Sequence, residues 1–153
     1  MGDNGLVANH YALLVEDVAA TVGHFEERLG VAFKSPARIP FDVAGHGERY
    51  SEVALACYSV DGSVELVEAH DSGPFAPPVG LHHFGGPVAD LEAAVAAQRG
   101  AGNEVEWELS YEGELIAVFF TGGGALPGRL ELVSASAPPL LEMYAESTEG
   151  EAA

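Results

Sequence analysis

The sequence has very little cysteine and very little positive charge, and each shortage excludes a class of protein. Cys57 is the single cysteine in 153 residues, so no internal disulfide can form. We therefore expect a reducing compartment, the cytoplasm. Lys and Arg number 6 against 24 Asp and Glu, which gives a formal net charge of −18. A nucleic-acid-binding protein needs a cationic surface that displaces counterions, so we expect no nucleic-acid partner.

Long apolar runs are also missing. No run approaches the roughly 18 residues that a membrane helix needs, and no basic segment leads into an apolar one. We therefore expect neither a membrane span nor a secretory signal. The hydrophobic content of 48% is enough for one packed domain, or for two small modules that share a core. The acidic charge should slow the approach of a polyanionic ligand and attract divalent cations.

An internal repeat organises the chain. HYALLVEDVAATVGHFEERLG (10–30) and HFGGPVADLEAAVAAQRGAG (83–102) both open with His and reach an Asp after the same interval. Asp17 and Asp90 are suited to cap helix starts, and the Gly at each segment's end suits a left-handed helix cap. Strand-like segments follow each helix, and VELVEA closes one half as LELVSA closes the other. This order predicts two βαβββ modules.

The repeat sets the predicted organisation of the chain. We expect the chain to consist of an N-terminal lead (1–7), a first module (8–72), a linker (73–80), a second module (81–136) and a C-terminal segment with an acidic tail (137–153). Within the first module, Asp61-Gly62 lies between two β-rich runs and predicts a hairpin turn.

Four polar residues occupy equivalent places in the two halves. The repeat aligns His10 with His83, and Glu65 with Glu131. Each residue alone has an ordinary structural interpretation, as a strand-start histidine or a half-exposed strand glutamate. However, a carboxylate between apolar strand neighbours is costly to bury without a partner. Two imidazoles and two carboxylates facing one cleft would explain all four residues as ligands of a divalent metal.

These segments resemble a known family. NHYALLVEDVAATVGHFEERLG and GLHHFGGPVADLEAAV are similar to the openings of the two modules in the vicinal oxygen chelate superfamily. That superfamily includes glyoxalase I, bleomycin-resistance proteins and methylmalonyl-CoA epimerases, and the resemblance spans residues 8–135. It implies an α+β fold in which two βαβββ modules, in pseudo-twofold arrangement, form a cupped mixed sheet. It also implies homodimers.

The resemblance also implies a ligand set. Residue by residue, His10, Glu65, His83 and Glu131 correspond to ligands of a divalent ion (Ni, Co, Zn, Mn, Mg or Fe), with His83 preferred over its neighbour His82.

One further match favours the epimerases of this superfamily. They carry a proton-transferring glutamate at a fixed interval before the ligand of the first module, and that interval counted back from Glu65 ends at Glu48. Two features depart from their pattern. Pro87 and the two glycines before it replace an apolar run, which predicts an irregular strand. The linker is also shorter, which puts contacts to a thioester tail in doubt.

The expected function is a metal-dependent isomerase or epimerase, or a glyoxalase-like lyase, acting on a small carbonyl-containing molecule. Glu48 or Glu131 would move a proton α to the carbonyl, through a metal-stabilised enolate. Two alternatives stay open: a metal-free protein that binds an antibiotic or metabolite, and a specialised-metabolism enzyme (a cyclase, a hydrolase or an extradiol-type dioxygenase). Five side chains remain open as lining residues of the site: His46, His82, Tyr58, Trp107 and Phe120.

Overall fold

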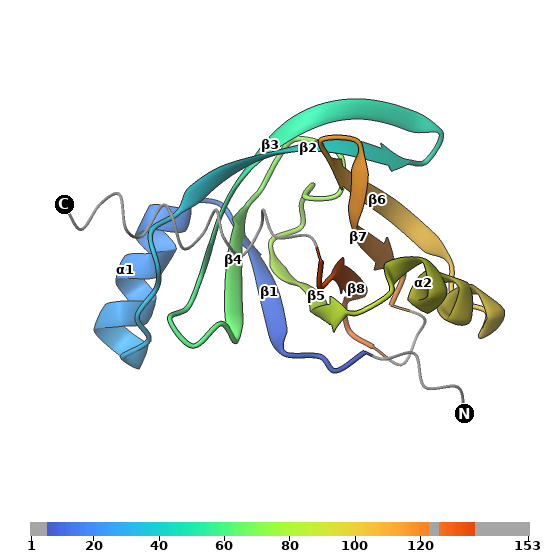
Figure 1. Cartoon of the computed structure of the whole chain (residues 1–153). Helices are drawn as coiled ribbons and strands as arrows, with labels where there is room; N and C mark the ends of the chain where they lie inside the picture. The colour runs from blue at the N-terminus through green and yellow to red at the C-terminus, as the bar shows by residue number, and fades with distance from the viewer. Residues whose placement is uncertain (1–5, 123–125, 137–153) are drawn as a thin grey trace. The chain divides into compact units, whose positions relative to one another are not determined.

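The computed structural model describes residues 6–122 and 126–136, and these contain eight strands and two helices (Figure 1). Residues 1–5 of the predicted lead and the whole predicted C-terminal segment lie outside these ranges. The elements follow the order β-α-β-β-β twice, so the predicted α+β class and succession of elements are confirmed. Their bounds are β1 (His10–Val15), α1 (Val18–Leu29), β2 (Ala37–Gly45), β3 (Glu48–Tyr58), β4 (Val64–Glu68), β5 (Gly80–Val88), α2 (Leu91–Gly100), β6 (Val105–Tyr111), β7 (Glu114–Phe120) and β8 (Arg129–Ser134).

The chain forms two compact units, which we name after their helices. Among the described residues, the α1 unit comprises residues 10–39 and 53–82. The α2 unit comprises residues 6–9, 40–52 and 83–136. The chain passes from one unit to the other within β2 and returns within β3, so the β2–β3 hairpin tip belongs to the α2 unit.

In the α1 unit, the helix covers one face of the strands. β1 runs parallel to β4 with Ala12 opposite Glu65, and β3 runs antiparallel to β4 with Tyr58 opposite Glu65. Strand side chains alternate between faces. The core against α1 consists of Val18, Cys57, Val64 and Leu66, with Leu13, Val15, Val22, Phe25, Phe33 and Leu55 packed around them. Glu65 therefore lies on the face opposite α1.

The α2 unit repeats this arrangement. β5 runs parallel to β8 with Gly85 opposite Glu131, and β8, β7, β6 and β2 follow in antiparallel pairs. The core against α2 consists of Val88, Leu91, Ala94, Val95, Val118, Phe120 and Leu132. Because Leu132 and Phe120 face the helix, Glu131 and Phe119 lie on the other face.

Both helices begin where the sequence predicts. Asp17 Oδ1 accepts a hydrogen bond from the backbone N–H of Ala20, and Asp90 Oδ1 accepts one from that of Ala93, each at 2.9 Å. Gly30 ends α1 at a φ of 66°, which glycine adopts without strain. Within the described residues, neither helix has the length and apolar character needed to cross a membrane.

β5 differs from the sequence expectation. It pairs with β8 without a break from His83 to Val88, so the predicted irregular strand is wrong. Close packing, rather than an irregular strand, explains the glycine at position 86. A Cβ on Gly86 would overlap the backbone carbonyl of Val7, because residues 7–9 run beside this strand and Asn9 N–H donates to Gly85 O at 2.9 Å.

Candidate metal site

The α1 unit places a buried imidazole beside a buried carboxylate. His10 is 8% exposed and Glu65 is 6% exposed, and His10 Nε2 lies 3.9 Å from Glu65 Oε2. The edge of the His10 ring meets Tyr58 at a centroid distance of 5.5 Å. All three side chains lie on the face opposite α1, because His10 is two residues from Ala12, and Ala12 and Tyr58 are the strand partners of Glu65.

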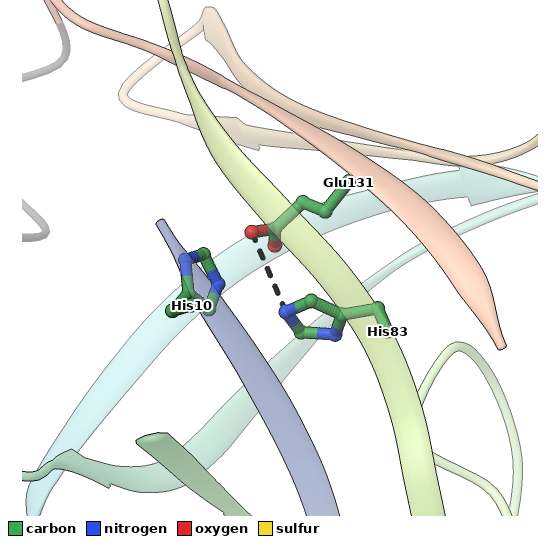
Figure 2. A group of neighbouring side chains, drawn as sticks. All are labelled: His10, His83 and Glu131. Carbon is green, nitrogen blue, oxygen red and sulfur yellow. Dashed lines mark ion pairs between the residues drawn. The ribbon is translucent and has the colours of Figure 1, made fainter. Parts of the chain in front are cut away.

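The α2 unit contains the equivalent pair. Figure 2 shows the Glu131 carboxylate directed toward His83, whose Nε2 lies 3.5 Å from Glu131 Oε1. His83 is fully buried and packs against the Phe119 ring at 5.1 Å, and Glu131 is 7% exposed. These side chains share the face opposite α2.

The two His–Glu pairs occupy equivalent positions in the two repeats. In each unit the histidine lies two residues before the strand partner of the glutamate, Ala12 for Glu65 and Gly85 for Glu131. The structure therefore bears out the alignment of the two halves. The separations of 3.5 and 3.9 Å exceed a direct N–H···O hydrogen bond and leave each pair's donor atoms near one another.

The chemistry of this donor set fits a divalent cation. Imidazole nitrogen and carboxylate oxygen are ligands that Zn, Ni, Co, Mn and Fe accept. His10, His83 and Glu131 each offer a ligand atom of this kind, as does Glu65. A cation would also compensate the cost of keeping two carboxylates away from water.

The predicted base, Glu48, lies at the exposed start of β3. His46 and Gly47 both have positive φ (51° and 76°) and form the two-residue turn before it, so Glu48 lies opposite Gly45. Gly45 has no side chain because Trp107 occupies that space: a Cβ there would overlap the indole ring. Trp107 is in turn the strand partner of Phe119, and Phe119 is the partner of Glu131. Glu48 thus shares a row and a face with Glu131.

A second glutamate of β3, which the sequence analysis did not single out, lies on the same face. Glu52 is four residues beyond Glu48, half-buried, and its Oε1 is shielded from solvent. The available signal was the alternation in ERYSEVALACY, which puts Glu48, Tyr50, Glu52 and Ala54 on one side.

Tyr50 lies between these two glutamates. Its hydroxyl is buried and has no hydrogen-bond partner within residues 6–122 and 126–136. Burial, and then the negative charges of Glu52 and Glu48, raise the pKa of the Tyr50 phenol. The group is therefore a protonated hydrogen-bond donor at neutral pH.

The second histidine of the adjacent pair has a structural partner. His82 is buried, its Nε2 lies 2.6 Å from the Pro74 carbonyl oxygen, and its ring packs against Phe75. His82 therefore holds the linker in place, while its neighbour His83 pairs with Glu131.

The structure also shows where the other candidate lining residues of the site lie. Phe120 belongs to the core against α2. Tyr58 and Trp107, in contrast, lie on the same faces as the His–Glu pairs of their units. His46 is exposed and rests on Trp107, with the two ring centroids 4.6 Å apart.

An ion pair that the sequence analysis did not predict lies two residues from Glu131. Arg129 donates to both oxygens of Glu106, Nε at 2.8 Å and Nη2 at 3.1 Å. Burial alone would raise the pKa of Glu106, but the hydrogen bond and charge of Arg129 outweigh it and lower that pKa. The pair links β6 to β8 at the end of the sheet where His83 and Glu131 lie.

Comparisons with known proteins agree with this architecture. The family model of the Glyoxalase/Bleomycin resistance protein/Dioxygenase superfamily matches residues 9–120. No curated protein matches the chain. Among solved structures, a variant of Streptomyces coelicolor methylmalonyl-CoA epimerase in complex with 2-nitronate-propionyl-CoA has 19% identity and a TM-score of 0.53, covering 85% of this chain and 97% of its own.

Two further structures match over a similar length. Methylmalonyl-CoA epimerase from Mycobacterium tuberculosis has 18% identity and a TM-score of 0.55, covering 92% of this chain and 99% of its own. A hypothetical protein from Bacillus halodurans C-125 has 13% identity and a TM-score of 0.60, covering 85% and 94%. At these identities the likeness concerns the fold.

Proposed function

The chain belongs to the glyoxalase/bleomycin resistance/dioxygenase superfamily, and we propose that it is a metal-dependent isomerase or epimerase that moves a proton α to a substrate carbonyl. The observation that carries this proposal is the duplicated pair: each unit holds a buried imidazole beside a buried carboxylate, at equivalent positions and on the face away from its helix.

We propose His10, Glu65, His83 and Glu131 as the ligands of one divalent cation. When bound, such a cation supplies positive charge that stabilises negative charge on a substrate oxygen. The protein's own contribution is to hold the four side chains in place. The His83 ring is wedged against Phe119, and the His10 ring against Tyr58. The pairing of β1 with β4 and of β5 with β8 fixes each His relative to its Glu.

A carboxylate of β3 is the proposed proton carrier. The sequence predicts Glu48 as this proton carrier, and Glu48 lies in the same row of the sheet as Glu131. Glu52 is the second candidate, favoured by its shielded oxygen, since a carboxylate away from water passes a proton to the substrate rather than to the solvent. Return of the proton to the opposite face of the α carbon, by a second acid or after the substrate turns, inverts that carbon, and return to a neighbouring atom isomerises the substrate. Glu131, which was also predicted to carry a proton, acts here as a ligand.

Metal binding is the first test. Metal-free protein prepared with a chelator is titrated calorimetrically with Ni²⁺, Co²⁺, Zn²⁺ and Mn²⁺. We expect one cation per chain for at least one of these metals, and weaker binding in His10→Ala and His83→Ala. His82→Ala is the matched control, because His82 is equally buried and adjacent in sequence but bonded to Pro74. Failure of every metal to bind would favour the metal-free binder.

Proton transfer is the second test. Metal-loaded protein in D₂O is mixed with acetoin, methylmalonyl-pantetheine or 2-methylacetoacetyl-pantetheine, and deuterium entering the α position is followed by NMR. We expect metal-dependent exchange into at least one compound. Loss of the true base should slow it by a factor of about 10² to 10⁴. Glu48→Gln, Glu52→Gln and the double variant are compared for this purpose, and exchange that survives in the double variant would exclude these two glutamates as the base.

A further inference from the structure

The Tyr50 hydroxyl is a buried hydrogen-bond donor. No described residue accepts its hydrogen bond, although the oxygen is shielded from solvent. Leaving such a group unpaired in a folded protein costs about 1 to 3 kcal/mol, so its retention calls for a partner other than the described residues. A bound ligand is such a partner.

The position of Tyr50 in the sheet puts its side chain on the face of the proposed site, the face that holds Glu131. The turn at His46-Gly47 aligns Tyr50 with Val43, in agreement with the hydrogen bond from Ser51 Oγ to Asp42 Oδ1 at 2.7 Å. Val43 pairs with Leu109, Leu109 with Ala117, and Ala117 with Val133. Val133 is two residues beyond Glu131, so Tyr50 and Glu131 lie on the same face of one continuous sheet, in neighbouring rows.

The charges around Tyr50 decide what it can bind. Glu48 and Glu52, the same-face neighbours on either side of it, are both acidic. Arg49 and Ser51 belong to the other face of β3. The negative charges favour the protonated phenol, as its raised pKa indicates. The same charges repel an anionic acceptor. An uncharged oxygen, in contrast, can accept the hydrogen bond without that penalty.

We propose that Tyr50 is a specificity-determining residue whose hydroxyl donates a hydrogen bond to an uncharged oxygen of the substrate, a ketone, ester or hydroxyl oxygen, and that the site disfavours a substrate with a carboxylate at this position. This inference rests on the proposed function and narrows its substrate class. The overall charge of −18 acts in the same direction, because it opposes the approach of anionic substrates.

Two thioesters of nearly equal shape test this inference. 2-Methylacetoacetyl-pantetheine and methylmalonyl-pantetheine both carry an acidic α hydrogen between two carbonyl carbons. They differ in that a ketone methyl in one is a carboxylate oxygen in the other. Deuterium exchange catalysed by the metal-loaded protein is measured with each compound for wild type, Tyr50→Phe and Tyr111→Phe. Tyr111→Phe is the matched control, because it removes the same hydroxyl from a half-buried tyrosine of β6.

We expect wild type to prefer the uncharged ketone. Tyr50→Phe should lower kcat/KM for it about tenfold, with no loss for the carboxylate compound, as expected for one lost hydrogen bond. Tyr111→Phe should change neither value. Equal losses with both compounds, no loss in Tyr50→Phe, or a wild-type preference for the carboxylate would overturn the inference. In the last case the proposed function would stand.

Binding provides a readout that does not depend on turnover. If neither compound exchanges, the proposed proton transfer fails, and the Kd of the ketone compound is then measured calorimetrically. A Kd about tenfold weaker in Tyr50→Phe than in wild type supports the role of Tyr50. Equal values, or no binding by wild type, refute it. Melting temperatures of the variants verify that each one is folded.

Discussion

Replacing Glu131 by Gln should have opposite effects on the metal-free and the metal-loaded protein. The side chain is 7% exposed and lies beside His83, and its strand partner on β7 is Phe119. Gln has the same size but no charge. In the metal-free protein the substitution removes a carboxylate that is costly to bury, so the melting temperature should stay equal or rise. In the metal-loaded protein it removes one of the proposed ligands.

The size of the second effect follows from binding linkage. A metal at a free concentration about 100 times its Kd stabilises the folded state by about 2.7 kcal/mol. For a chain of 153 residues this raises the melting temperature by about 5 to 10 °C. If loss of Glu131 weakens binding about 100-fold, the gain at the same concentration falls to about 0.4 kcal/mol, or about 1 to 2 °C.

The assay is thermal unfolding with chelator and with each of Ni²⁺, Co²⁺, Zn²⁺ and Mn²⁺. Glu114→Gln is the control, because it makes the same change at an exposed position of the α2 unit. The control should keep both the wild-type melting temperature and the wild-type metal shift. A Glu131→Gln protein that is strongly destabilised in chelator, or that keeps the full metal shift, would refute the reasoning.

Four further outcomes test the packing. His82→Ala should lower stability by about 1 to 3 kcal/mol in chemical unfolding, because the Pro74 carbonyl loses its partner, while the metal shift stays intact. Gly45→Ala should destabilise by about 1 to 3 kcal/mol because its Cβ overlaps the neighbouring strand. Gly23→Ala, which meets nothing within 4 Å in mid-helix, should stabilise by up to about 1 kcal/mol. Cys57, whose thiol pKa is raised to about 12 by burial and then by a nearby carboxylate, should resist alkylation at pH 8 until the protein is unfolded; rapid labelling of the native protein would contradict this.

Much of the fold could be predicted because its signals are local or repeated. Asp17 and Asp90 mark helix starts through capping bonds that span three residues. The Asp61 turn is equally local, since its carboxylate accepts from Ser63 and Ser59. The equivalence of the two halves could be predicted from the sequence because duplication preserves the interval from His to Asp.

The neighbours of the site were harder to predict because they depend on register between distant strands. Whether Glu48, Tyr50 or Glu52 shares a row with Glu131 is set by four successive strand pairings, and a shift of one residue would turn each side chain to the other face. The Arg129–Glu106 pair joins residues 23 positions apart, and no spacing rule selects it. Close packing is equally hard to predict from the sequence. Gly86 suggests an irregular strand, and only the structure shows that the backbone of residues 7–9 leaves no room for a side chain there.

The duplicated module explains why the His–Glu pair of each unit lies on one side of its sheet. Each helix covers one face with aliphatic and aromatic side chains, and this packing provides the hydrophobic stabilisation of its unit. The opposite face can therefore hold groups that cost stability: the His–Glu pairs and the Tyr50 hydroxyl, which has no partner in the part of the chain that the structure describes. Because these groups weaken the metal-free protein, a cation and an uncharged carbonyl compound should each stabilise it. The two should also bind more tightly together than alone, because the cation would attract an oxygen of the compound.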